Sequence, residues 1–116
     1  MSFTEIRNFL KEMQSDIALK KNIVGISTSC IDNIKKLNPV TFEWKQDNGG
    51  ALIDGVKNMG FVAQEVEKII PEVVKGEDGQ KAINVTGIVA QLTKALQESI
   101  TKIETLEAKV AALEGS

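Results

Sequence analysis

From Thr86 to Leu113 the chain reads TGIVAQLTKALQESITKIETLEAKVAAL, and its apolar residues recur in a seven-residue pattern. Positions a and d of this heptad carry the pattern. Position a holds Val89, Leu96, Ile103 and Val110, and position d holds Val85, Leu92, Ser99, Leu106 and Leu113. Ser99 is the one polar residue among these nine. The pattern predicts a long helix, N-capped by Thr86, with an apolar stripe along its length.

Charged residues flank this stripe in a regular register. Lys102 and Lys109 fall at position g, and Glu107 and Glu114 fall at position e. A g residue meets the e residue five positions on in a neighbouring chain only when the helices are parallel, so the register predicts a parallel coiled coil. β-Branched residues at a with Leu at d favour a coiled coil of two helices, but Ser99 at d and the apolar Ile100 at e weaken that preference. The alternative is a surface helix that packs only on its own domain.

Upstream of this helix the sequence predicts several short elements. Val40–Lys45 alternates apolar and polar residues, which predicts a half-buried strand, and Met59–Ala63 predicts a second strand. Gln64–Ile70 is typical of a short helix that ends at Pro71. Gly76–Gly79 predicts the turn of a hairpin. Residues 51–58 between the two strands are assigned to a loop.

The N-terminal third predicts two helices separated by an irregular segment. Apolar residues recur every three to four positions in Met1–Gln14, which predicts a short helix. Residues 15–26 have no helical pattern and are expected to be extended or irregular. Ser27, Thr28 and Ser29 offer N-caps for a helix that carries Cys30, Ile31, Ile34 and Leu37. Asn38-Pro39 ends that helix, because the residue before proline is pushed out of the helical region.

Composition excludes much chemistry. The 116 residues contain no His and a single Cys, Cys30, so His-dependent triads, Cys-His dyads and multi-Cys metal sites are excluded within one chain. We therefore expect no metal and no cofactor. The formal net charge of −2, with interspersed signs, argues against a duplex nucleic acid partner. No apolar run approaches the roughly 20 residues of a membrane span, and no secretion signal is evident, so a reducing cytosol is expected.

Ser15 and Lys20 are a candidate pair for nucleophilic chemistry without histidine. A solvated loop is the simpler interpretation, because Ser and Lys are common residues. Side chains five residues apart diverge by about 140° on a helix and lie on opposite faces of a strand. The segment must therefore turn if they are to meet, or they must come from different chains. Holding a free lysine neutral at pH 7 costs about 4–5 kcal/mol, so the pair also requires burial.

Four segments together resemble a known family. SDIALKKNI (Ser15–Ile23) precedes LNPVTFEWK (Leu37–Lys45), MGFVAQEVEKIIPEVV (Met59–Val74) and the heptad helix. This order resembles the C-terminal intramolecular chaperone domain of endosialidase-type phage tailspikes, which also occurs on tail fibres and neck appendages. The resemblance covers roughly Ser15–Glu114.

The resemblance implies a homotrimer that holds three chains in register while an upstream fibrous stem of the same polypeptide folds. It also implies self-cleavage immediately before the motif serine. The matching residues make Ser15 the nucleophile, Lys20 the general base and Gln14–Ser15 the scissile bond. Lys21 is the alternative base if the register differs by one. The chain departs from the family in one respect, because the segment before Ser15 looks helical and not β-helical.

These inferences predict an α+β fold with a small mixed sheet, short helices and a long C-terminal helix that forms a parallel trimeric bundle. Residues 1–14 are expected to be an upstream linker or helix, 15–85 the body, and 86–116 the coiled-coil helix. The predicted function is a self-releasing intramolecular chaperone that acts in the host cytoplasm during virion assembly, its parent protein residing on the virion. The alternatives are a chaperone that does not cleave and a coiled-coil interaction module, which would be monomeric in isolation.

Overall fold

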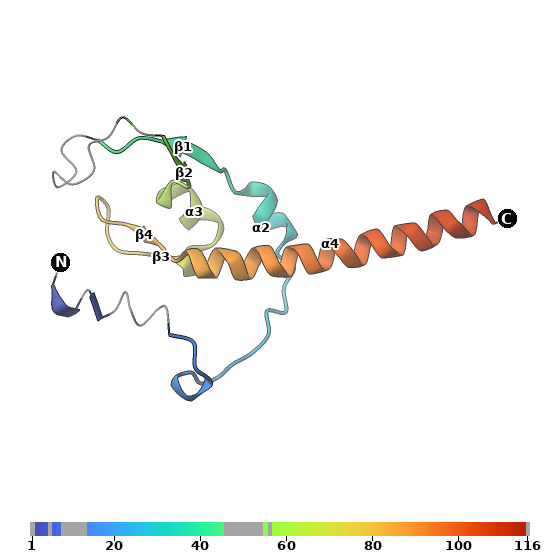
Figure 1. The fold of residues 1–116 in the computed structure, drawn as a ribbon, viewed down its shortest axis with the longest axis horizontal. Coiled ribbons are helices and arrows are strands. Elements are labelled where there is room, and N and C mark those ends of the chain that lie inside the picture. The colour runs from blue at the N-terminus through green and yellow to red at the C-terminus, as the bar shows by residue number, and fades with distance from the viewer. Residues whose placement is uncertain (1, 5, 8–13, 46–54, 56, 116) are drawn as a thin grey trace.

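The fold is built along one long helix, and the computed structural model describes it over residues 2–4, 6–7, 14–45, 55 and 57–115. Short elements gather along the first half of α4 (Val85–Glu114), whereas its C-terminal half projects away from them (Figure 1). The other elements are η1 (Ile17–Leu19), α2 (Ile31–Lys36), β1 (Val40–Phe42), β2 (Asn58–Gly60), α3 (Ala63–Ile69), η2 (Pro71–Val73), β3 (Val74–Lys75) and β4 (Ala82–Ile83). The predicted α+β class with a long C-terminal helix is confirmed.

The predicted mixed sheet is wrong. The described residues form two separate two-stranded ribbons, β1–β2 and β3–β4, and both are antiparallel. In the first ribbon Thr41 pairs with Met59, and in the second Val74 pairs with Ile83. A parallel pair in the same sheet would need a crossover, usually a helix, and no described helix connects two parallel strands in this way.

The strands are shorter than the sequence pattern predicts. β1 ends at Phe42 and not at Lys45, but Trp44 still packs edge-on against Phe42, with ring centroids 5.1 Å apart. The predicted helices near residues 30–37 and 64–70 are confirmed within one residue at most ends. The predicted helix over residues 1–14 and the loop over 51–58 lie largely outside the described residues, although residues 3–4 and 6–7 are helical.

Asn84, and not the predicted Thr86, is the N-cap of α4. Its backbone is extended, and its side-chain oxygen accepts a hydrogen bond from the Gly87 N–H at 3.2 Å. The N–H of Asn84 donates to the Val73 carbonyl at 2.7 Å, so this residue also joins the end of β4 to η2. The tertiary bond to Val73 holds Asn84 outside the helix, and its side chain is therefore free to cap the next turn.

The core lies where α3, η2, β3 and the first turn of α4 meet. Its buried members are Val66, Ile70, Val73, Val74 and Ile88. Gly87 allows α4 to approach η2 closely, since a Cβ at this position would lie 2.5 Å from Cγ1 of Val73. Val73 is buried and β-branched, so it has little freedom to move aside.

We expect Gly87→Ala to destabilise the domain by about 1–3 kcal/mol, because the added methyl group overpacks this contact. Denaturant unfolding followed by circular dichroism measures the change. Gly25→Ala is the matched control, because no atom lies within 4 Å of a Cβ built there. Equal unfolding free energies for the two variants would show that the Val73 contact does not limit the packing of α4.

Candidate functional site

A single 3-10 turn shapes the segment that contains Ser15 and Lys20. Asp16 caps η1, because its carboxylate accepts a hydrogen bond from the Ala18 N–H at 2.8 Å. The backbone N–H groups of Leu19 and Lys20 donate to the carbonyls of Asp16 and Ile17 at 3.0 and 3.2 Å. Asp is favoured at such a cap because its short side chain reaches the backbone two residues on. The turn reverses the chain between Ser15 and Lys20.

The turn brings the two predicted site residues together within one chain. Lys20 Nζ donates a hydrogen bond to Ser15 Oγ at 2.8 Å. The spacing alone required either a turn or a contact between chains, and the structure has the turn. Lys20, and not Lys21, is the lysine that contacts Ser15 among the described residues.

The surroundings of this pair are open in the single chain. Residues 14–29 are all exposed, including Ser15 and Lys20. The neighbouring Ile17 and Leu19 are 77% and 64% exposed, and neither contributes to the core. A serine is activated when an adjacent base accepts its proton, and a lysine does so only in its neutral form. Burial against another surface is the physical means of favouring that form.

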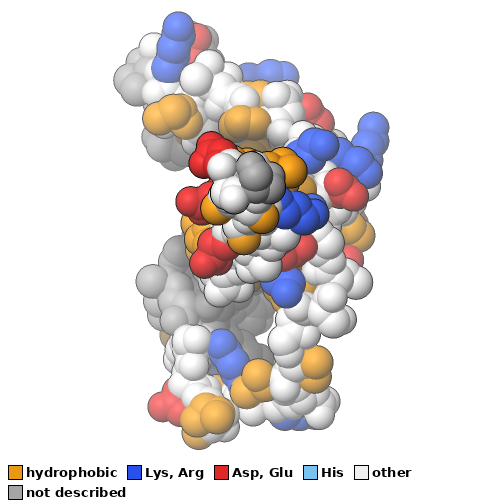
Figure 2. Space-filling view, turned by 90° about the vertical axis from the view of Figure 1, so that its right-hand side faces the viewer, with side chains coloured by type: hydrophobic (Ala, Val, Ile, Leu, Met, Phe, Trp, Pro, Cys, Tyr) orange, Lys and Arg blue, Asp and Glu red, His pale blue; other side chains and the backbone are white. Residues whose placement is uncertain are grey.

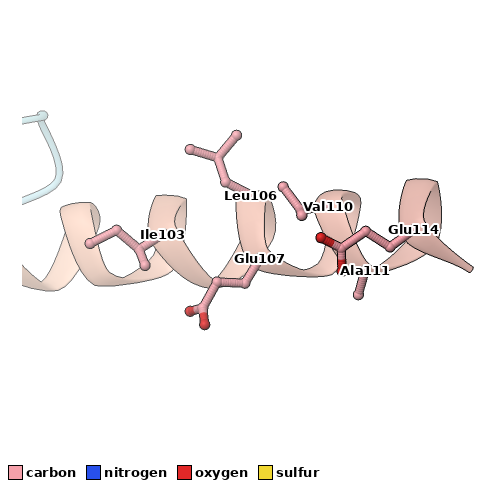
Figure 3. A pocket seen from close by; sticks show the side chains of 6 residues that line it. All are labelled: Ile103, Leu106, Glu107, Val110, Ala111 and Glu114. Atoms are coloured by element: carbon pink, nitrogen blue, oxygen red, sulfur yellow. The ribbon is translucent and has the colours of Figure 1, made fainter.

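The second functional feature is the apolar stripe of α4, defined by the a and d residues. Apart from half-buried Ser99, its members are 44–75% exposed. Towards the C-terminus a shallow groove is lined by Ile103, Leu106, Glu107, Val110, Ala111 and Glu114. Figure 3 shows Leu106 and Val110 on one side of the helix and Glu107 on the other. Seen end-on in Figure 2, the projecting end of α4 carries apolar side chains beside acidic and basic ones.

A different face of α4 packs on the body. Ile88 and Ala95, at position g, are buried, and Gln91 and Glu98, at position c, contact α2 and the residues before it. The helix therefore packs on its own domain over its first half, as the alternative interpretation required, while the a/d stripe stays uncovered. The coiled coil remains a prediction.

Glu98 holds the point where α2 begins. Its carboxylate accepts a hydrogen bond from the Cys30 N–H at 3.0 Å, at the N-terminus of α2, where negative charge is favourable. Hydrogen bonds from the Ser29 side chain and the Cys30 N–H hold the pKa of Glu98 below its usual value. Sequence reasoning missed this contact because its partners are 68 residues apart. Cys30 itself is buried.

The described residues contain no group of three or more acidic or Cys side chains arranged to hold a metal ion. Likewise, none of the described helices is both long and apolar enough to span a bilayer.

The sequence profile of one family, described as the chaperone of endosialidase and classed as peptidase S74, matches residues 15–75. The match covers more than half of the chain and begins at Ser15, the first residue of the turn described above. This chain belongs to the chaperone-of-endosialidase family. Membership gives the domain a chaperone role and places it in a peptidase family.

The chaperone-of-endosialidase domain is similar to phage tail fibre proteins. It is 31% identical over 102 residues to the long tail fiber protein Gp37 of Enterobacteria phage K3, covering 88% of this chain and 8% of that protein. The match to Gp37 of Enterobacteria phage T2 has the same identity and covers 7% of that protein. A probable tail fiber protein of Escherichia phage Phieco32 is 32% identical over 110 residues, with 14% of its length covered. The chain thus spans a small part of these relatives.

In this chaperone-of-endosialidase domain the Glu98 contact gives a prediction about pH. Because the pKa of Glu98 is depressed in the folded chain, its stabilisation is complete above pH 4.5, the usual value, and is lost as the pH falls through the folded pKa. Glu98→Gln should lower the Tm at neutral pH and should lose less stability than the parent on acidification. Thermal unfolding followed by circular dichroism tests this. The control is Glu104→Gln, an exposed site on α4; if it behaves like Glu98→Gln, the capping contact is not the cause.

Proposed function

We propose that this domain trimerises through α4, holds an upstream stem of the same polypeptide in register while it folds, and then releases itself by cleavage at Gln14–Ser15. The observation that carries the proposal is the 2.8 Å hydrogen bond from Lys20 Nζ to Ser15 Oγ across η1. The start of the family match at Ser15 supports the same assignment.

In the proposed reaction a neutral Lys20 accepts the hydroxyl proton of Ser15. Ser15 Oγ attacks the carbonyl carbon of Gln14, the C–N bond to Ser15 breaks, and the nitrogen leaves as the amine after taking up a proton. Water then hydrolyses the Gln14 ester, which gives the Gln14 carboxylate and restores the Ser15 hydroxyl. The nucleophile and the attacked carbonyl are adjacent in the chain, so little positional entropy is lost on the way to attack. No cofactor or metal enters this scheme.

The exposure of the pair supports a requirement for assembly. In the observed contact Lys20 is the donor, whereas the reaction needs it as the acceptor. Covering the pair with a neighbouring chain or with the stem disfavours the charged lysine. Cleavage then follows only after the three chains have come together, which makes it a test of correct assembly.

A chaperone of this kind solves a folding problem of fibrous stems. Interwound chains form many contacts between residues distant in sequence, and such structures fold slowly. Three parallel helices joined at one end raise the effective concentration of the chains for each other. Once the chaperone domain is released, a stem that unfolds has no template on which to refold. The folded stem is then stable for kinetic reasons. We assign assembly to the host cytoplasm and the mature fibre to the virion, as the similarity to tail fibre proteins supports.

Intact mass spectrometry of the protein expressed with its natural upstream stem tests the cleavage. We expect two products that separate at Gln14–Ser15 in the parent, and a single uncut chain in Ser15→Ala and Lys20→Ala. Lys21→Ala, the matched control, should still be cut. An uncut parent with a correctly folded trimeric stem would contradict the cleavage and favour the second candidate, a chaperone that does not cut. The observation that favours this second candidate is the open surroundings of Ser15 and Lys20 in the single chain.

A further inference from the structure

Residues 14–28 form an arm whose one hydrogen bond with the rest of the described chain is the contact of Cys30 Sγ with the Thr28 carbonyl at 3.7 Å; Ser29, the next residue, is held by the Glu98 carboxylate of α4. Every residue of the arm is exposed, and five of them are large and apolar: Ile17, Leu19, Ile23, Val24 and Ile26. Between residues 21 and 27 no backbone hydrogen bond joins the arm to another described residue. Such a surface is unfavourable in water unless something covers it.

The second half of the arm has the character of an unpaired strand. Residues 23–28 read IVGIST, in which Ile23, Val24, Ile26 and Thr28 are β-branched, and this stretch follows an extended course (Figure 1). β-Branched residues favour strands, and a strand gains stability only from pairing with another. We therefore expect the arm to pair with the edge of a sheet or to pack on the face of one.

The β1–β2 ribbon offers such a surface. Among the described residues it has only two strands, so its exposed face is not covered by a third strand of the described chain. Thr41 and Met59 are paired and lie on the same face, where Met59 is 88% exposed. A groove here is lined by Pro39, Val40, Thr41, Met59, Gly60 and Phe61. The lining is apolar except for Thr41, and it matches the apolar arm in chemistry.

The arm and the ribbon of one chain lie on opposite sides of α4 (Figure 1). The body of the chain packs on positions g and c of α4, through Ile88, Ala95, Gln91 and Glu98. In a parallel coiled coil the g side of each helix faces the e side of the next. In such a trimer the body of one chain would therefore lie beside the e side of the next chain's α4. The body of that next chain leaves this side of its helix open, and its arm lies on the same side (Figure 1).

We propose that residues 23–28 of one chain pack on the β1–β2 ribbon of the neighbouring copy and cover its Met59. This inference rests on the parallel homotrimer of the proposed function. Docking carries Ser15 and Lys20, a few residues upstream, onto the neighbour together with Ile17 and Leu19. The same step that completes assembly then buries the pair, which links cleavage to the presence of the neighbouring chain.

Cross-linking between two differently tagged chains tests the docking. Val24→Cys in one chain and Met59→Cys in the other are co-expressed, both with Ser15→Ala so that the upstream segment stays attached, and treated with a short bifunctional maleimide. We expect a covalent species that carries both tags. Two controls are the parent with only its buried Cys30 and the pair Val24→Cys with Thr105→Cys, which lies in the C-terminal half of α4.

Two results would overturn the docking. One is a trimer by ultracentrifugation in which the mixed chains do not cross-link; the other is a link found only inside a chain that carries both cysteines. A monomeric sample would overturn the trimer and the docking together. In a cleavable background, Val24→Glu should slow cleavage by on the order of tenfold or more while the trimer persists, because the arm would then bury a charge. Thr105→Glu should leave the rate unchanged; cleavage of Val24→Glu at the parental rate would contradict the link between docking and cleavage.

Discussion

Ser15→Ala is expected to abolish self-cleavage, with a loss of rate on the order of 10⁴-fold or more, because it removes the proposed nucleophile itself. The variant should fold normally. The turn depends on the Asp16 carboxylate and on backbone hydrogen bonds, none of which involves the Ser15 hydroxyl. The protein with its upstream stem, followed by intact mass over time, gives the rate directly.

Substitutions at Lys20 distinguish a role as general base from a role as a positively charged hydrogen-bond donor. Lys20→Ala should slow cleavage by about 10²–10⁴-fold, as expected for loss of a general base. Lys20→Arg should be equally slow, because arginine keeps the charge and the hydrogen-bonding ability but cannot lose its proton. Cleavage of Lys20→Arg at the parental rate would show that Lys20 positions Ser15 without accepting its proton.

Leu106→Asp is expected to convert the proposed trimer to monomers and to stop the proposed cleavage with it. Leu106 is 59% exposed in the single chain and is one of the residues that line the groove in Figure 3. Burying one leucine side chain is worth about 1.5–3 kcal/mol, and the trimer loses this contribution three times. Three carboxylates are also brought into one apolar layer, where like charges repel strongly. Sedimentation velocity measures the oligomeric state, and intact mass measures the cleavage.

The body should survive this change, because its core lies at the first turn of α4, far from Leu106. Circular dichroism should therefore still report a folded chain. Thr105→Asp, the adjacent exposed position outside the stripe, is the matched control and should remain trimeric. A trimeric Leu106→Asp variant would contradict assembly through the a/d stripe. A monomer that still cleaves itself would show that cleavage does not require the trimer.

Local patterns predicted most of the elements correctly. The residues near 64–70 show a helical period and then a proline, and α3 follows them closely. The strands were overestimated, because alternation of apolar residues continues to Trp44 while pairing in the ribbon ends at Phe42. The N-cap was placed at Thr86 because capping preference is a local property. Asn84 has the tertiary hydrogen bond to Val73 that decides where the helix begins.

The sequence alone determined the long helix, its apolar stripe and the spacing of Ser15 and Lys20, because the periodicity of apolar residues and the number of residues between two positions follow directly from the sequence. The tertiary structure decided which faces of α4 are used. It put Ile88, Ala95 and Glu98 against the body and left the a/d stripe uncovered, a choice made by contacts between residues far apart in the chain. It also decided that Ser15 meets Lys20 within one chain, because the side chain of Asp16 closes the turn between them.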